Sequence, residues 1–286
     1  ESEVKRREAE QARAALSHYV SPNLAELLAE NPEMLELGGE RRELSFVCTD
    51  MADYTPFIEN SEPARAVSVM NEYISGLCAI VLQHEGTIDT VVGDAVIAMF
   101  GAPLHQEDHA QRAVDCALEL DAFAGVFQAR KNAEGIRVGQ TRIGVHTGNA
   151  VVGNIGGDMY FHYTAQGDAI VTAARLEKAN KHLGTRICIS EATASRIADF
   201  PGRPVGNLQL KGIKSSIDAF EPSRGFSREH NHASIAAFNK LEAGDAEAVK
   251  AFAAIVGDSG EDALARFHLQ RLLSGEKGVA VDLTRV

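Results

Sequence analysis

A β-hairpin is predicted by residues 87–100, which have the sequence TIDTVVGDAVIAMF. Two apolar runs rich in β-branched residues flank the pair Gly93-Asp94, and a Gly-Asp pair between such runs is a strong signal for a tight turn. The hairpin would place the carboxylate of Asp94 at its tip. An aspartate in a turn is commonly a turn residue and nothing more, so Asp94 alone does not indicate chemistry.

The partner for Asp94 is Asp50, which ends a second apolar run, LSFVCT at residues 44–49. This run predicts a buried strand, and two carboxylates held by neighbouring strands can bind a pair of divalent ions. Two such ions suit phosphoryl or nucleotidyl transfer, because one lowers the pKa of an attacking hydroxyl and the other neutralises charge on the leaving phosphates. The two aspartates therefore predict a nucleotide enzyme.

Composition is typical of a soluble globular protein, with 45% hydrophobic and 24% charged residues in 286. No signal segment or membrane-spanning run is evident, which predicts a cytoplasmic protein; because the chain begins at Glu1, the cytosolic part of a membrane-anchored protein is the alternative. The net charge of −12 argues against a broad nucleic-acid-binding surface. The four cysteines lack the spacing of a zinc site and indicate a reducing compartment.

Strand-like and helix-like segments alternate over residues 43–222, which predicts a layered α/β or α+β domain. Within it we expect a strand at 141–147, then a glycine-punctuated turn, and a helix over 168–180. Residues 1–42 predict a helical signalling linker that follows an upstream sensor or membrane domain outside this chain. Residues 223–286 are alanine-rich and predict a C-terminal extension of two or three helices.

Four segments in order carry a family likeness: FVCTDMADYTPF at 46–57, VGDAVIAMFGAP at 92–103, GVHTG with VVGNIG over 144–156, and YTAQGDAIVTAARLE at 163–177. Together they resemble the catalytic domain of class III adenylyl/guanylyl cyclases, particularly bacterial ones. The resemblance implies a ferredoxin-like α+β fold that works as a head-to-tail homodimer, with a nucleoside triphosphate in the cleft between protomers. It implies that ATP is converted to 3′,5′-cyclic AMP and pyrophosphate by a mechanism that uses two Mg²⁺ or Mn²⁺ ions.

The resemblance also assigns roles to individual residues. The metal ligands would be Asp50, Asp94 and the carbonyl of Met51. The triphosphate would lie on the amides at a turn into a helix, those of Ala52, Asp53, Tyr54 and Thr55. Across the dimer interface, Arg175 would stabilise charge on the α-phosphate, and Lys211 would contact the terminal phosphates, with Lys214 as the alternative. The purine would be recognised from Thr90 and Thr164.

Two of these positions depart from the family pattern. Thr90 stands where adenylyl cyclases of this family usually carry a lysine, so the base stays open between ATP, GTP and others. Val171 stands where an asparagine usually orients the ribose, and losing one such contact costs on the order of ten- to a thousand-fold in rate. Asp89 adjoins Thr90 and is expected to point to the opposite face of its strand.

Two other functions compete with an active cyclase. The first is a catalytically weak cyclase homologue that acts as a nucleotide-binding dimer module, which Thr90 and Val171 motivate. The second is a diguanylate cyclase, which needs a Gly-Gly-Asp/Glu-Glu-Phe hairpin that the lone Gly156-Gly-Asp158 does not supply. The histidines do not indicate a metal site. His105 and His109 predict a surface cluster at the start of a helix.

Overall fold

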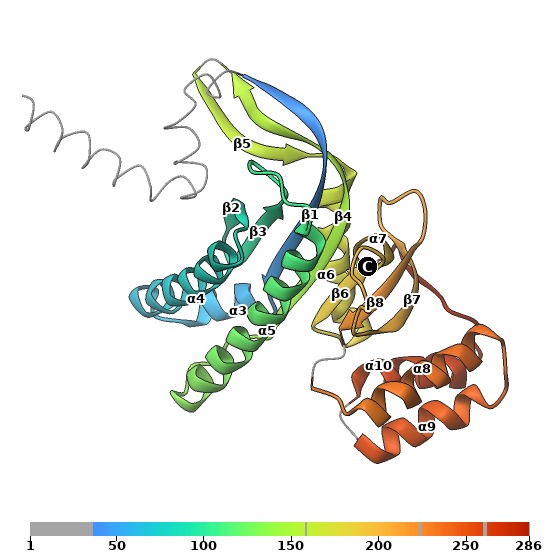
Figure 1. Ribbon diagram of the computed structural model, residues 1–286. Helices are drawn as coiled ribbons and strands as arrows, with labels where there is room; N and C mark the ends of the chain where they lie inside the picture. The colour runs from blue at the N-terminus through green and yellow to red at the C-terminus, as the bar shows by residue number, and fades with distance from the viewer. Residues whose placement is uncertain (1–36, 158, 223–224, 260–261, 286) are drawn as a thin grey trace, which may run out of the picture.

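The computed structural model describes residues 37–157, 159–222, 225–259 and 262–285, so the predicted linker lies almost wholly outside the described residues. The described chain forms one nine-stranded mixed sheet in the order β2-β3-β1-β4-β6-β8-β7-β9, with β5 paired to β4 (Figure 1). The strands are β1 (Gly38–Met51), β2 (Thr87–Val92), β3 (Ala95–Phe100), β4 (Thr141–Gly157), β5 (Tyr160–Gln166), β6 (Ile187–Ser190), β7 (Gly202–Leu210), β8 (Ile217–Pro222) and β9 (Ala280–Leu283). The helices are α3 (Tyr54–Asn60), α4 (Pro63–Gln83), α5 (His109–Ala133), α6 (Asp168–Leu183), α7 (Glu191–Ala194), α8 (Arg228–Glu242), α9 (Ala248–Ser259) and α10 (Ala263–Leu273).

Helices cover the central strand β1 on both faces. Val47 and Met51 pack in the core cluster that α4 and α5 share. Phe46 and Cys48 belong to a second cluster, which contains residues of α6. Because side chains alternate across a strand, this pattern gives an α+β layered domain with β1 in its middle. The predicted fold class is confirmed.

Helix α4 begins as its sequence dictates, because Pro63 takes the first helical position and the Glu62 side chain accepts hydrogen bonds from two following amides. It buries Tyr73, Leu77 and Val81 in the core. By length and hydropathy this helix could cross a bilayer, which corrects the prediction that no run is long enough. The helix packs against α5 and the sheet as a core helix does, so its length and hydropathy do not indicate a membrane span.

Helix α6 lies directly on β4 because Gly144 has no side chain. A Cβ at Gly144 would come within 2.1 Å of the Ala173 carbonyl oxygen and 2.3 Å of the Glu177 nitrogen. The helix can therefore approach the backbone of β4, which places Arg175 and Glu177 at fixed positions relative to the end of β1.

The strand β4 is longer than the sequence predicted. It continues through Gly148 and Gly153 to Gly157, where we expected a turn after residue 147. The extra length is paired with β1 on one side and β5 on the other, and Gly153 lets Gly38 approach closely. The result is an arm of β5, the second half of β4 and the start of β1 that extends away from the helices (Figure 1).

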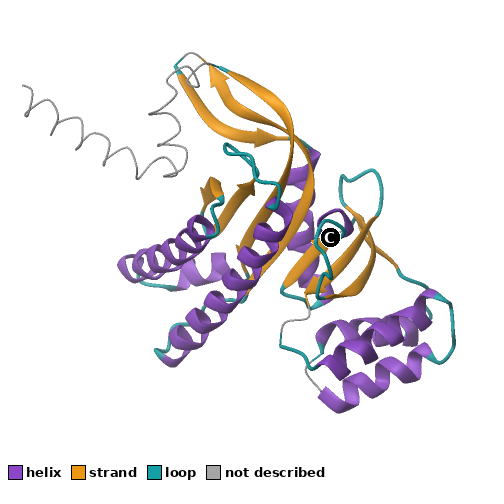
Figure 2. Cartoon of the chain, viewed as in Figure 1, coloured by secondary structure: helices purple, strands orange, loops and turns teal. Residues whose placement is uncertain are grey.

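The three helices α8, α9 and α10 form a group with a core of its own, which includes Phe238, Phe252 and Ala265 (Figure 2). A buried ion pair links this group to the sheet, because the Arg203 guanidinium of β7 donates to Asp262 at 2.9 Å and to Glu221 at 2.7 Å. The chain then forms a strand that was not predicted: β9 pairs in parallel with β7. The extension is therefore helical with an added edge strand.

Candidate active site

The hairpin tip is fixed against the end of β1. Asp94 Oδ2 accepts a hydrogen bond from the backbone N–H of Met51 at 2.6 Å, and Asp94 is only 6% exposed. The turn is possible because Gly93 takes a left-handed conformation with φ 61°. Burial raises the pKa of Asp94, the Met51 amide opposes this, and the charge of Asp50 raises the pKa further. The structure thus brings Asp50 and Asp94 together.

A half-buried arginine connects this pair of aspartates to α6. Arg142 of β4 pairs with the carboxylate of Asp50, and its Nε lies 3.2 Å from Oε1 of Glu177. The second contact is an ion pair by distance without hydrogen-bond geometry, since neither atom has a hydrogen-bond partner in the described chain. Burial, and next the charge of Asp50, raise the pKa of Glu177 to about 8. Sequence reasoning missed both residues, although Arg142 is a charged residue inside an apolar strand.

The donor set at this point fits a hard divalent cation. Asp94 is buried beside a second carboxylate, and no cationic side chain pairs with it in the described ranges. Carboxylate and carbonyl oxygens are the protein ligands that Mg²⁺ and Mn²⁺ prefer. The described residues contain no cluster of three or more His, Cys, Asp or Glu side chains that could hold a metal ion. The remaining ligands would come from a main-chain carbonyl, water and substrate phosphates, as is common for Mg²⁺.

The turn between β1 and α3 offers fewer amides than predicted. The N–H of Ala52 donates to the carbonyl of Gln140 at 2.9 Å, which extends the pairing of β1 and β4 by one residue. This corrects the prediction for Ala52, whose amide is not free for a phosphate. No backbone acceptor takes the amides of Asp53, Tyr54 and Thr55 in the described chain, as expected at a helix start.

A basic notch lies on the other side of α6. It is lined by Arg175, Lys178 and His182 of the helix and by Lys211 at the end of β7, and Leu283 of β9 closes it. The Nε of Arg175 is buried without a hydrogen-bond partner in the described chain, so the guanidinium has an unused donor there. The structure brings Arg175 and Lys211 together, whereas Lys214 does not line the notch.

The two groups of predicted residues are not joined within one chain. In the described ranges no hydrogen bond or ion pair links Arg175 or Lys211 to Asp50 or Asp94. Val171, also on α6, is 43% exposed and does not line the basic notch.

Of the two predicted base-recognition residues, only Thr164 lies on the arm. Thr90 lies on β2 at a bulge in its pairing with β3. The hydroxyl of Thr164 on β5 donates to Oδ1 of Asp89 at 2.6 Å. Asp89 is 5% exposed and is the residue that sequence reasoning set aside. The available signal was a charged residue in a predicted strand whose other side chains are apolar or carry a hydroxyl group.

The histidines have structural partners. His109 is buried and its Nδ1 lies 2.8 Å from Oγ of Ser45, which corrects the prediction that it lies at the surface. His146 bonds Ser190 Oγ at 2.8 Å, and burial lowers the pKa of His146 to about 4.

Comparison with known proteins identifies the family. A sequence model of the adenylate and guanylate cyclase catalytic domain matches residues 39–221. The chain belongs to this family. It is 36% identical over 200 residues to adenylate cyclase 1 of Rhizobium meliloti, a match that covers 68% of this chain and 30% of the relative. It is 25% identical over 198 residues to the adenylate cyclase of Anabaena cylindrica, covering 66% and 38% of the two chains.

Two solved cyclase structures share the fold of this cyclase domain. The adenylyl cyclase CyaB from P. aeruginosa matches with a TM-score of 0.60 and 29% identity over 67% of this chain and 100% of its own. The guanylyl cyclase Cya2 matches with a TM-score of 0.59 and 30% identity over 68% and 98%. An adenylyl and a guanylyl cyclase thus match equally well, so overall likeness does not choose the base. The chain spans about a third of the length of the curated relatives that it matches.

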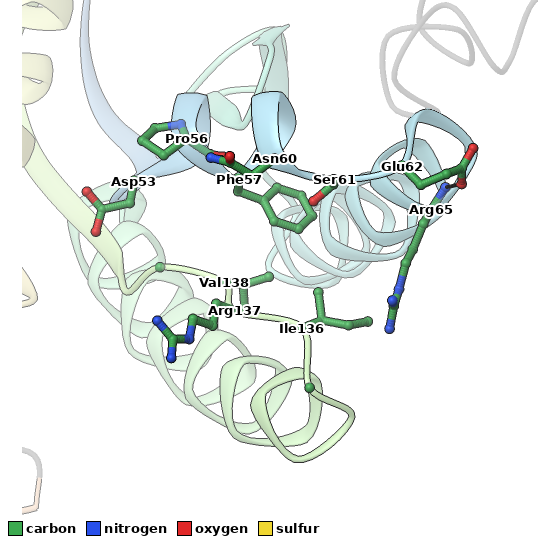
Figure 3. A pocket seen from close by; sticks show the side chains of 12 residues that line it. Asp53, Pro56, Phe57, Asn60, Ser61, Glu62, Arg65, Ile136, Arg137 and Val138 are labelled. Atoms are coloured by element: carbon green, nitrogen blue, oxygen red, sulfur yellow. Dashed lines mark hydrogen bonds between the residues drawn. The ribbon is translucent and has the colours of Figure 1, made fainter.

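A larger pocket of about 660 Å³ adjoins the cyclase site (Figure 3). It lies between α3 with the first turn of α4 on one side and the loop at residues 135–139 on the other, with Phe57 and Val138 from opposite walls. Of the predicted site residues only Asp53 lines it. The cavity is therefore a neighbour of the predicted nucleotide site and does not contain it.

Proposed function

We propose that this chain is an adenylate cyclase that converts ATP to 3′,5′-cyclic AMP and pyrophosphate. The observation that carries the proposal is the bond from the Met51 amide to Asp94, which holds the hairpin tip so that the buried carboxylate of Asp94 lies close to the half-exposed carboxylate of Asp50. Family membership and the adenylate cyclase of Rhizobium meliloti, at 36% identity, support the choice of reaction.

The reaction is an intramolecular displacement at phosphorus. The ribose 3′-oxygen forms a bond to the α-phosphorus and loses its proton to solvent, while the bond from the α-phosphorus to the bridging oxygen breaks and pyrophosphate leaves with that electron pair. Two bound divalent ions would supply activation of the 3′-hydroxyl and neutralisation of the leaving phosphates. Asp50, Asp94 and the Met51 carbonyl would hold them.

The basic notch would serve the same reaction from the phosphate side. Arg175 has an unpartnered buried Nε, and a guanidinium suits the charge that builds on equatorial phosphate oxygens. Lys211 lies in the same notch and would contact the terminal phosphates. Neither residue acts on a proton, so their contribution is electrostatic and positional.

The site would be completed by a second copy of the chain. The notch and the aspartates have no polar link within one protomer, so a head-to-tail homodimer would bring one protomer's notch to the partner's aspartates. Exposed apolar side chains support such an interface on the arm, β2 and α6: Val91, Val92, Val151, Met159, Phe161 and Val171.

A weak or inactive nucleotide-binding dimer module is the second candidate. Val171 favours it, because an exposed valine cannot hydrogen-bond a ribose hydroxyl. A protein with this function would bind nucleotide and metal but would not form a cyclic product.

Product analysis tests the proposal. The purified chain is incubated separately with ATP, GTP, CTP and UTP, each with Mg²⁺ or Mn²⁺, and products are identified by liquid chromatography and mass spectrometry. We expect cyclic AMP and pyrophosphate in equal amounts, and none after chelation of the metal. Metal-dependent nucleotide binding without any cyclic product would instead support the second candidate.

Asp94→Asn is the matched variant for the same assay. An asparagine oxygen can still accept the Met51 amide, so the hairpin tip stays in place, while the carboxylate charge is lost. We expect turnover to fall by about 100-fold or more with the melting temperature little changed. Asp168→Asn, at the exposed start of α6, is the control and should keep full activity. Full activity in Asp94→Asn would exclude the metal assignment.

A further inference from the structure

A side-chain contact joins two strands that do not pair, and the proposed reaction does not account for it. β2 pairs with β3 and β5 with β4, yet Oδ1 of Asp89 on β2 accepts from the Thr164 hydroxyl at 2.6 Å and from the Ala165 amide at 3.2 Å. Asp89 is 5% exposed, so its carboxylate is withdrawn from water and committed to β5. Burying a carboxylate is costly unless it is hydrogen-bonded, and here both bonds go to the place predicted to face the purine.

The bulge in β2 explains how Asp89 reaches β5. Ile88 pairs with Ala98 and Thr90 with Ile97, so Asp89 is the extra residue that has no partner in β3. A bulge re-aims a side chain that a regular strand would point elsewhere. Burial along β2 still alternates, with Asp89 buried and Thr90 half-buried.

The contact fixes the direction of the Thr164 hydrogen bond. A threonine hydroxyl has one hydrogen and two lone pairs, and an ionised carboxylate only accepts. Once the hydrogen is directed at Asp89, Thr164 can offer a ligand only a lone pair. A free threonine can donate or accept and therefore distinguishes poorly between a donor and an acceptor on a base.

An acceptor at this place selects between the purines. Adenine carries an amino group at position 6, which donates, and guanine carries an oxygen there, which accepts. Two acceptors facing each other leave both without a partner, which disfavours guanine. The selection does not need a lysine at position 90, where this chain has a threonine.

We propose that Asp89 is a positioning residue that sets base selectivity: it holds the Thr164 hydroxyl as a hydrogen-bond acceptor, and so the site takes a purine with an amino group at position 6. This inference rests on the proposed function, because it assumes that Thr164 faces the base of a bound nucleoside triphosphate. It goes further, because it gives a physical reason for the preference for adenine and assigns that preference to Asp89, which has no role in the family pattern.

The test compares ATP with ITP and GTP in the wild type and in variants of Asp89 and Thr164. ITP has the oxygen at position 6 without the 2-amino group of guanine, so it isolates the position that Thr164 would face. Asp89→Ala frees the Thr164 hydroxyl, and we expect the ratio of kcat/KM for ATP to that for ITP to fall by about 10-fold or more. Asp89→Asn should keep the ratio within about threefold, because the amide oxygen can still accept from Thr164 and Ala165.

A double-mutant cycle separates positioning from general damage. Thr164→Val removes the hydroxyl and should lower the same ratio, and adding Asp89→Ala to it should change the ratio no further. If Asp89 only supports the fold, Asp89→Ala will reduce kcat/KM for all three nucleotides equally and leave the ratio unchanged. That result would overturn the inference, as would a loss of selectivity in Asp89→Asn equal to that in Asp89→Ala.

Equilibrium binding keeps the test independent of turnover. The 2′,3′-dideoxy forms of ATP and GTP lack the attacking hydroxyl and cannot be cyclised, so their Kd values report recognition alone. We expect wild type to prefer the adenine form and Asp89→Ala to lose that preference. A chain that binds with this selectivity and makes no cyclic product would overturn the proposed function while supporting the inference. Equal Kd values for the two bases in wild type would overturn the inference itself.

Discussion

At the residue scale, Val171 gives a direct test of the proposed ribose contact. Val171 is 43% exposed on α6, four residues before Arg175, where the family pattern has a ribose-orienting asparagine. Valine and asparagine have similar helix propensities, so Val171→Asn should change stability by no more than about 0.5 kcal/mol. If residue 171 faces the ribose, the restored amide should raise kcat with ATP by about 10-fold.

The control for Val171→Asn is Val171→Ala, which removes the branched side chain and adds no hydrogen-bonding group. Steady-state kinetics of both variants, with thermal unfolding beside them, separates the two effects. A rise in the alanine variant as large as in the asparagine variant would mean that bulk, not a missing hydrogen bond, limits the rate.

At this scale the sequence predicted contacts that follow from local signals but not those that depend on distant partners. Asp50 and Asp94 were predictable because each follows a strong local signal, a strand end or a Gly-Asp turn. The hydrogen bond from the Ala52 amide to the carbonyl of Gln140 was not predictable, because the partner lies far along the chain. The same holds for Asp89 and Thr164, which meet across two strands that do not pair.

Among the elements, β9 allows a specific prediction about nucleotide binding. It pairs with β7 so that Leu283 lies opposite Leu210, the residue before Lys211, and Leu283 lines the basic notch. We therefore expect β9 to hold the end of β7 from which Lys211 emerges. Leu283→Ala should raise KM for the nucleotide several-fold and cost about 2 kcal/mol of stability, a fall of a few degrees in melting temperature.

Val281→Ala is the matched control for Leu283→Ala. Val281 lies on the same strand, is 6% exposed against 7% for Leu283, and packs in the same core without lining the notch. It should lower the melting temperature by a comparable amount and leave KM unchanged. Equal changes of KM in the two variants would show that β9 acts only through general stability.

The strand β4 shows why some elements resist prediction. The hairpin of β2 and β3 follows from a local turn signal, but the passage of β4 through Gly148 and Gly153 does not. Glycines usually interrupt a strand, and here pairing with β1 from Thr141 to Asn154 compensates for their weak preference. Long-range pairing of this kind leaves no mark in the local sequence, and the same is true of the unpredicted strand β9.

For the whole molecule, the central question is whether one site needs two chains. Within a protomer the basic notch of Arg175 and Lys211 has no polar contact with Asp50 and Asp94 in the described residues. A head-to-tail dimer has two equivalent sites, each built from one protomer's aspartates and the partner's notch. Asp94→Asn and Arg175→Ala then damage opposite halves of a site.

Mixing these two variants gives the decisive measurement. Each is expected to be inactive alone, but a mixed dimer has one site that carries both changes and one that carries neither. With equal amounts and free exchange, half of the dimers are mixed and each has one intact site, so activity should return to about a quarter of wild type. Mixing Asp94→Asn with Asp50→Asn is the control, because both changes affect the same half and no intact site can form. Absence of recovery in the first mixture, with subunit exchange verified by mass spectrometry, would mean that each chain builds its site alone.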